Sequence, residues 1–132
     1  MSGPDYIQGV RTNTSDSVLL LFALLQRIPA QTRVGYAEYW WNTHRVLADQ
    51  EVPAEFGMQG YLHNYVDAAD PCSWDGIGEI YEASLDAARA RTVWVDGPAG
   101  QVIRDDEDNF LRKDTRRVYV TAQHVVIPLR HS

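Results

Sequence analysis

The chain has a single cysteine, a single lysine and only one long apolar run. Cys72 alone cannot form an intramolecular disulfide, and without a basic neighbour or a helix start beside it we expect no nucleophilic role. A reducing, cytoplasmic location is the default for such a composition. The apolar run, residues 18–25, is far shorter than the ~20 residues of a membrane-spanning helix, and residues 1–17 lack the basic start of a signal peptide.

Positive charge is scarce as well. Lys and Arg total 12 against 18 Asp and Glu, which gives a net charge of −6. Binding to a phosphate backbone needs clustered cations, so we expect no nucleic-acid partner, and no membrane partner either. The sequence also lacks a His-Glu-x-x-His motif, a glycine-rich phosphate loop and a Gly-x-Ser-x-Gly elbow. It therefore does not favour a metalloprotease, a nucleotide-binding protein or a serine hydrolase.

A chain of 132 residues with 45% hydrophobic residues can build one core. We predict a flexible tail over residues 1–16 and one domain over residues 17–132. Alternating or continuous apolar patterns predict four strands, at residues 18–25, 58–66, 75–82 and 117–127.

Two helices are predicted between these strands. Thr32 can cap the first, and Pro53 prevents it from continuing. Ser84 can cap the second, which runs to about Val93, and Gly97-Pro98 then forms a turn that can start a short helix.

The resulting order β-α-β-β-α-β is the α+β, ferredoxin-like pattern, with a four-stranded antiparallel sheet covered by helices on one face. The second face of this sheet also needs cover. A second copy of the same sheet could provide it, so we expect a homodimer.

His44 is the first candidate for chemistry. It shares the inner face of the first helix with Tyr36, Trp40 and Leu47, where an imidazole needs a buried partner or a ligand. An imidazole can accept and donate a proton at neutral pH, which suits general acid-base catalysis. The alternative is a core histidine satisfied by a backbone carbonyl.

The third strand offers two carboxylates as partners for His44. Asp75 and Glu79 lie on one strand face with Ile77 and Tyr81, and the opposite face carries two glycines that leave room for another element or a ligand. Asp75 or Glu79 could orient His44 and stabilise its imidazolium. If this face is a solvated rim, both are ordinary surface charges.

The second strand places an imidazole between two phenols. His63 lies on the same face as Tyr61 and Tyr65, and the three could supply a proton donor and an enolate-stabilising hydroxyl. Burial at the dimer seam is the competing interpretation.

Several aromatic and apolar residues could hold a flat substrate by stacking and burial, although many of them could equally be plain core. The candidates are Tyr36, Trp40, Trp41, Tyr61, Ile77 and Tyr81. The acidic run 105–108 lacks the glycine-punctuated spacing of a calcium loop, so we predict a solvated turn and no metal site there.

Four segments together resemble the EthD family of the dimeric α/β-barrel superfamily. They are Tyr39-Trp40-Trp41-Asn42-Thr43-His44, the stretch from Trp74-Asp75-Gly76 to Glu79, the acidic run before Phe110-Leu111, and the final Val125-Val126-Ile127. The resemblance spans residues 18–127. It implies a barrel built from two sheets, an active-site cavity between the sheet and the helices of each subunit, and chemistry usually done without metal or flavin.

The resemblance and the candidate residues lead to one functional hypothesis. The protein is expected to be a cofactor-independent enzyme of secondary metabolism that acts on a cyclic aromatic or polyketide-like substrate as a cyclase, dehydratase or decarboxylase. In this scheme His44 moves the proton, Asp75 or Glu79 orients it, and Tyr65 or His63 steadies the oxyanion. The alternatives are a cofactor-free oxygenase and a non-catalytic dimeric binding or accessory protein.

Overall fold

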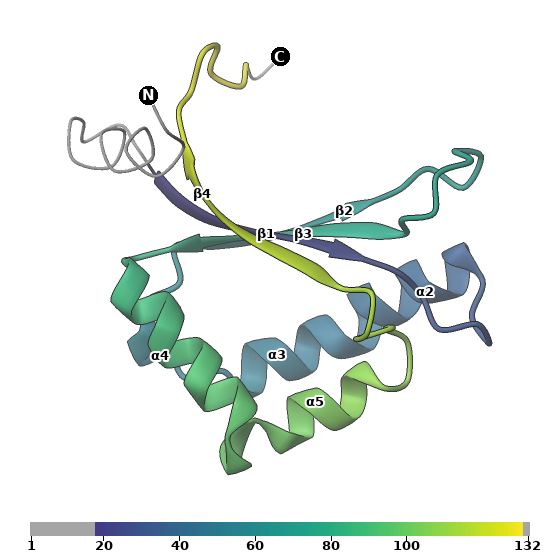
Figure 1. Ribbon diagram of the computed structural model, residues 1–132, viewed down its shortest axis with the longest axis horizontal. Coiled ribbons are helices and arrows are strands. Elements are labelled where there is room, and N and C mark those ends of the chain that lie inside the picture. Colours follow the sequence, from purple (N-terminus) through teal and green to yellow (C-terminus); the bar gives the residue numbers. More distant parts are fainter. Residues whose placement is uncertain (1–17, 131–132) are drawn as a thin grey trace.

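The computed structural model describes residues 18–130, and it folds as one four-stranded sheet with every described helix on the same side (Figure 1). The strands are β1 (Val18–Leu25), β2 (Gly60–Tyr65), β3 (Gly76–Glu82) and β4 (Arg117–Gln123). All neighbours pair antiparallel, in the order β2-β3-β1-β4. The predicted ferredoxin-like fold is therefore confirmed, whereas the predicted tail over residues 1–16 lies outside the described residues.

The helical layer begins with one long helix that contains an irregular turn. It consists of α2 (Arg33–Tyr39), the π-helical turn η1 (Trp40–His44) and α3 (Arg45–Glu51). The hydroxyl of Thr32 accepts a hydrogen bond from the backbone N–H of Gly35, as predicted for an N-cap. The π turn is not visible in the sequence pattern. Such turns are frequent at functional sites, and this one ends at His44.

The remaining helices follow β3. Helix α4 (Leu85–Asp96) is capped by Ser84, as predicted, and is three residues longer than expected. The short 3-10 turn η3 (Pro98–Gly100) then leads into α5 (Gln101–Glu107), and another 3-10 turn, η2 (Ala54–Phe56), follows α3. The prediction of a solvated turn over residues 105–108 is wrong, because the first three of these residues belong to α5 and Glu107 is buried.

The last strand is shorter than predicted. β4 pairs only with β1 in the described sheet, and Gln123 is the partner of Val18, the first residue of β1. Residues 124–127 form no strand, so β4 ends at Gln123 rather than at Ile127. The apolar residues that follow are exposed, and Figure 1 shows this segment leaving the body of the protein.

The sheet has a helix face and an outer face. Gly76 and Gly78 lie on the helix face, where they make room for Trp40: a Cβ on Gly76 would lie 2.7 Å from the Trp40 Cζ3 atom. The expectation that these glycines admit another element is confirmed. Trp40 and Tyr36 join Leu25, Phe110 and Leu111 in the buried core cluster.

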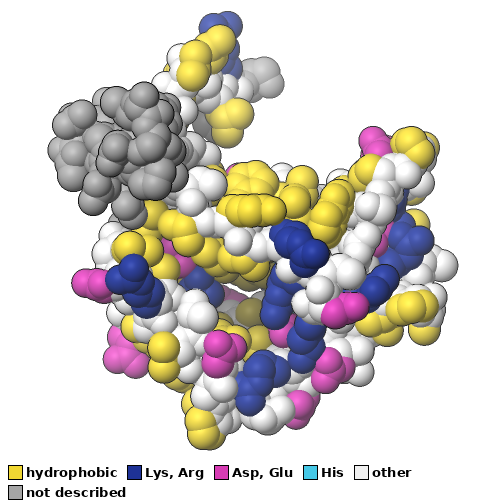
Figure 2. Space-filling model, in the orientation of Figure 1, with side chains coloured by type: hydrophobic (Ala, Val, Ile, Leu, Met, Phe, Trp, Pro, Cys, Tyr) yellow, Lys and Arg dark blue, Asp and Glu magenta, His cyan; other side chains and the backbone are white. Residues whose placement is uncertain are grey.

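The outer face is largely apolar. The strand registers place on it Leu20, Phe22, Leu24, Leu62, Ile77, Glu79, Tyr81 and Tyr119. Leu62 is 45% exposed and Tyr119 is 54% exposed, so the face is accessible in the single chain. Figure 2 shows apolar side chains gathered along the side of the sheet that is turned away from the helices.

Candidate active site

His44 lies between the sheet and the helices and is paired with a carboxylate. It is 6% exposed, and its Nδ1 is 2.8 Å from the Oδ2 atom of Asp106 on α5. The Phe110 ring packs beside it, with ring centroids 4.9 Å apart. A buried imidazole thus has a charged partner, as the sequence required, and the alternative of a backbone carbonyl partner is wrong.

Asp106 is itself held in place by two further side chains. The Tyr39 hydroxyl donates to its Oδ1 atom at 2.5 Å, and the Asn109 amide reaches the same atom at 3.4 Å. Burial raises the pKa of Asp106, but hydrogen bonds from Tyr39, His44 and Asn109 outweigh this effect, and the pKa is lowered overall. Asp106 is therefore a carboxylate at neutral pH.

The ionised state of Asp106 determines the tautomer of His44. A carboxylate only accepts hydrogen bonds, so the Nδ1 of His44 carries a proton. In the neutral ring Nε2 is then the basic nitrogen, and it makes no hydrogen bond to any residue between 18 and 130. This is the arrangement of a general base whose imidazolium form is stabilised by a carboxylate.

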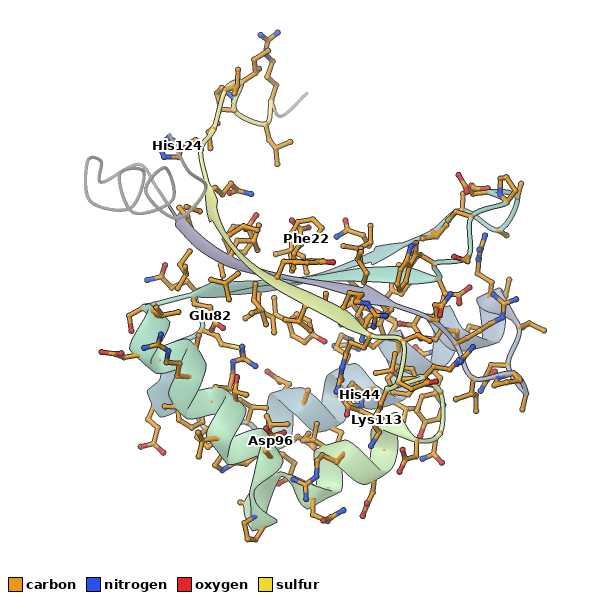
Figure 3. All side chains as sticks on the ribbon, in the orientation of Figure 1. Phe22, His44, Glu82, Asp96, Lys113 and His124 are labelled. Carbon is orange, nitrogen blue, oxygen red and sulfur yellow. The ribbon has the colours of Figure 1, made fainter. Side chains whose placement is uncertain are left out.

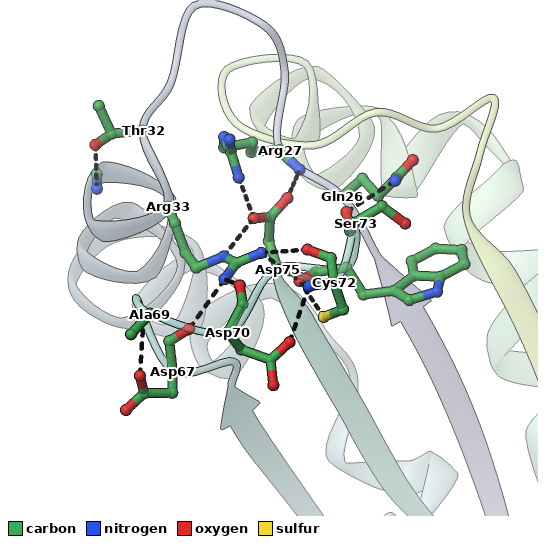
Figure 4. Close-up of polar contacts among 12 residues, drawn as sticks. Gln26, Arg27, Thr32, Arg33, Asp67, Ala69, Asp70, Cys72, Ser73 and Asp75 are labelled. Carbon is green, nitrogen blue, oxygen red and sulfur yellow. Dashed lines mark hydrogen bonds and ion pairs between the residues drawn. The ribbon is translucent and has the colours of Figure 1, made fainter.

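The two carboxylates expected beside His44 lie elsewhere. Asp75 is 1% exposed and accepts hydrogen bonds from the backbone N–H of Arg27 and from Arg33 Nε, at 2.8 and 3.0 Å, as well as from the Arg27 guanidinium. Arg33 also donates to carbonyls of the loop that precedes β3, so Asp75 anchors a structural network (Figure 4). Asp75 is therefore not the partner of His44.

Glu79 is excluded from the site by the strand register. It pairs with Phe22 and points to the outer face, where it accepts a hydrogen bond of 2.7 Å from the Asn64 amide. Ile77 and Tyr81 share this face. The expectation that this side of β3 faces the helices is wrong, because the glycine side packs against Trp40 instead. In Figure 3 Phe22 and His44 lie on opposite sides of the sheet.

The predicted cluster on β2 does lie on the helix face. His63 stacks on Trp40 with ring centroids 3.7 Å apart, and its Nδ1 is 2.8 Å from the Tyr65 hydroxyl. Burial first of all, together with the charges of His44 and Arg45, lowers the pKa of His63 to about 4, so the ring is neutral. The ring of His63 therefore faces the helices and not the outer face of the sheet.

The expected substrate-binding aromatics divide into three environments. Tyr36 and Trp40 are 0% and 2% exposed and belong to the core. Trp41 is 49% exposed, with the Arg45 guanidinium 4.1 Å from its ring centroid. Tyr61 lies on the helix face, and burial raises the pKa of its hydroxyl to about 12 although the residue as a whole is 38% exposed. Tyr61 thus brings a buried hydroxyl to the interior, as the core residue Tyr36 also does.

Four charged residues extend this interior beyond His44, and the sequence analysis assigned a role to none of them. Glu82 on β3 pairs with Arg91 on α4, and Glu107 on α5 pairs with Arg116 at 2.9 Å. Glu82, Arg91 and Glu107 are all buried. Figure 3 shows Glu82 and His44 on the same side of the sheet, and Figure 2 shows the surface hollowed between the sheet and helices α4 and α5.

For the buried acidic residues of α5, helical spacing in the sequence could have indicated that they face the interior. Ile103, Glu107 and Phe110 are spaced by four and three residues, and all three are buried. Asp106 precedes Phe110 by four residues, which puts it next to the same face. No comparable signal pairs Glu82 with Arg91, because their contact joins a strand to a helix.

Solved structures with this fold include EthD-family proteins. An EthD family protein from Bacillus halodurans matches with a TM-score of 0.52 and 16% identity, over 83% of this chain and 99% of its own. An EthD-like protein from Ralstonia eutropha matches with a TM-score of 0.52 and 12% identity, over 83% of this chain and 94% of its own. A dimeric protein of unknown function and ferredoxin-like fold from Bacteroides fragilis matches with a TM-score of 0.51 and 7% identity, over 82% of this chain and 96% of its own. At these identities the likeness shows a shared fold, the one that the sequence resemblance implied.

Neither protein-family models nor curated proteins match the sequence. Among residues 18–130, no helix combines the length and the apolar character needed to cross a membrane. In the same residues, His, Cys, Asp and Glu side chains do not gather in threes as a bound metal ion would require.

Proposed function

We propose that this protein is an EthD-like enzyme that needs no cofactor and uses His44 as its general base. The observation that carries the proposal is the buried hydrogen bond between His44 Nδ1 and Asp106. Asp106 holds the Nδ1 side of His44, while the basic Nε2 atom has no hydrogen-bond partner among residues 18–130, and this free nitrogen beside a hollowed interior favours a catalytic role over a purely structural one. The fold shared with EthD-family proteins is consistent with an enzyme.

The surroundings favour a cyclic aromatic or polyketide-like substrate. The Phe110 ring packs beside the imidazole of His44, and the aromatic cluster of Trp40, Tyr61 and His63 lies on the same side of the sheet. Flat rings bury area and orient well against such walls. A substrate of this class also contains carbon atoms between two carbonyl groups, whose protons are acidic enough for an imidazole base.

The proposed reaction is a proton transfer followed by ring closure. His44 Nε2 takes the proton from the activated carbon, and the electron pair of the C–H bond forms an enolate. The enolate carbon attacks a second carbonyl of the same molecule, and the new alkoxide takes the proton back from the His44 imidazolium, which Asp106 stabilises. The ring closure returns the proton that His44 removed, and it requires no oxidant. Loss of water from the product would give the dehydratase outcome.

The test is proton exchange, because it detects the first step without knowledge of the natural substrate. The protein is incubated in D₂O with benzoylacetone, which has an acidic carbon between two carbonyls, and deuterium incorporation is followed by NMR. We expect acceleration over buffer, and a loss of about 10²–10⁴-fold in His44→Ala. His124→Ala, which removes an exposed imidazole outside the site, is the matched control.

Each other result has a defined meaning. Equal rates in His44→Ala and the unmodified protein, or no acceleration over buffer at all, would overturn the general-base proposal. Binding of benzoylacetone without exchange would favour the non-catalytic binding protein, and consumption of dioxygen during turnover would favour the cofactor-free oxygenase.

We further propose that the enzyme is a homodimer in which a second copy covers the outer face. The apolar outer face has no described helix over it, and burial of such a surface is the main favourable term in association. The structurally similar Bacteroides fragilis protein is dimeric. Light scattering coupled to gel filtration measures the mass directly, and a monomer at micromolar concentration would contradict the proposal.

A further inference from the structure

The side chain of Arg91 contains a buried hydrogen-bond donor that nothing in the described protein satisfies. The side chain is 10% exposed, and its Nη2 atom bonds to the carboxylate of Glu82. Its Nε atom is buried and has no hydrogen-bond partner. A buried hydrogen-bond donor without an acceptor lowers the stability of the folded state, and the loss is larger when the donor group is charged. The donor therefore points to an acceptor that residues 18–130 do not supply.

The position of Arg91 places this donor in the same interior as the His44 pair. Glu82 lies on the helix face of β3, so Arg91 bridges the sheet and α4. Helix α5 contacts both α4 and the π turn of His44, and it carries Asp106 and Glu107 toward the interior. Figure 3 shows Glu82 and His44 on the same side of the sheet.

The Tyr61 hydroxyl is close enough to Arg91, Glu107 and Trp40 for each of them to affect its pKa. Burial raises the pKa of the Tyr61 hydroxyl most, Trp40 lowers it, and the charges of Glu107 and Arg91 raise and lower it by smaller amounts. Trp40 precedes His44 by four residues. The charged end of Arg91 is thus close enough to act on groups that line the same space as the general base.

We propose that Arg91 donates its free Nε–H to the substrate carbonyl oxygen that becomes the enolate oxyanion when His44 removes the adjacent proton. This inference rests on the proposed function and adds a second catalytic residue to it. Glu82 takes a single hydrogen bond from Nη2, which leaves the neighbouring Nε–H free to donate to one further oxygen. A donor fixed in a water-poor interior stabilises charge that develops there far better than a donor in water does. The substrate class is accordingly an enolisable ketone or a phenol that can carry a single oxyanion.

The test uses 4-nitrophenol, a planar compound with a single phenolic oxygen, whose ionised form absorbs visible light. The protein is titrated with nitrophenol at a pH where about half of the free compound is ionised. If Arg91 binds the oxyanion, absorbance of the ionised form rises on binding. In Arg91→Lys the ammonium can still pair with Glu82, but the Nε–H donor is lost. We expect about 10–100-fold weaker binding of the ionised form in this variant.

Two companion variants make the result specific. Glu82→Gln removes the competing negative charge and keeps Arg91, so the absorbance rise should persist or grow. His44→Ala removes the base and should also retain the rise. Thermal melting of each variant shows that it is folded, and benzoylacetone exchange in Arg91→Lys should fall about 10²–10³-fold, the usual loss when one oxyanion donor is removed.

The outcomes separate this inference from the proposed function. If the rise is lost in His44→Ala and kept in Arg91→Lys, or if nitrophenol shows no rise with the unmodified protein, the role of Arg91 is overturned while the exchange test of His44 stands on its own. If Arg91→Lys alone loses the rise but His44→Ala exchanges deuterium normally, the oxyanion site survives and the general-base proposal fails.

Discussion

Replacing Gly76 by alanine would place a methyl group in the tightest contact between the sheet and the helical layer. The added Cβ would lie 2.7 Å from the Trp40 Cζ3 atom and 3.1 Å from both Cε1 and the hydroxyl oxygen of Tyr36. Real Cβ atoms essentially never approach a neighbour within 3.0 Å. The two rings are 2% and 0% exposed, so neither can move into solvent without opening the core.

The expected cost of Gly76→Ala is about 1–3 kcal/mol of unfolding free energy, the usual range for an overpacked core. Gly78→Ala is a matched control on the same strand and face. Its Cβ would lie 3.6 Å from Trp40 Cζ2, an ordinary contact, and alanine restricts the unfolded chain. We therefore expect Gly78→Ala to change stability by less than about 1 kcal/mol, in either direction.

Urea unfolding followed by tryptophan fluorescence measures both variants. The two unfolding free energies should differ by at least 1 kcal/mol or so, with Gly76→Ala the less stable. Equal stability of the two variants would refute the packing of Trp40 against the Gly76 position, and with it the placement of the π turn and of His44 that follows from this contact.

Three further results are expected. The pKa of His63 is lowered to about 4, so between that pH and ~6.5 the unfolded chain binds a proton that the folded chain does not. Unfolding free energy should therefore rise with pH in this window by roughly 1 kcal/mol per unit, and His63→Gln should remove this dependence in urea titrations, whereas His124→Gln should not. Asp106→Asn should slow benzoylacetone exchange by about 10²–10⁴-fold, because the amide no longer stabilises the imidazolium of His44; an unchanged rate would exclude Asp106 from the mechanism. Phe22→Asp on the outer face should yield monomers in light scattering, whereas a charge at the exposed Val93 of α4 should leave the mass unchanged.

Most of the fold could be predicted because its signals are local. The bounds of β1 agree with the prediction at both ends, since an unbroken apolar run is typical of a strand with both faces packed. The caps at Thr32 and Ser84 were equally readable, because a hydroxyl beside free helix N–H groups needs no tertiary partner. The end of β4 could not be predicted, because the apolar pattern runs on to Ile127 whereas the strand ends at Gln123.

The orientation of β3 shows what alternation alone leaves open. A period of two assigns Asp75 and Glu79 to one side and the glycines to the other, but it does not say which side faces the helices. The catalytic interpretation of this strand relied on its acidic residues. The glycines carried the stronger information, because a large aromatic ring such as that of Trp40 can approach a strand closely only where side chains are missing.

The acidic run illustrates why the partner of His44 was missed. Four consecutive acids favour a solvated turn as long as no counter-charge is in view, because an unpaired buried carboxylate is costly. Two of these acids can lie in the interior because residues from other segments pair with them. Asp106 bonds to His44, which is 62 residues away in the sequence, and Glu107 accepts a hydrogen bond from Arg116. Helical spacing marked the face on which Glu107 and Phe110 lie, but the pairing itself exists only after the helical layer has packed against the sheet. Residue type thus identified the proposed base, and only tertiary structure could identify the carboxylate beside it.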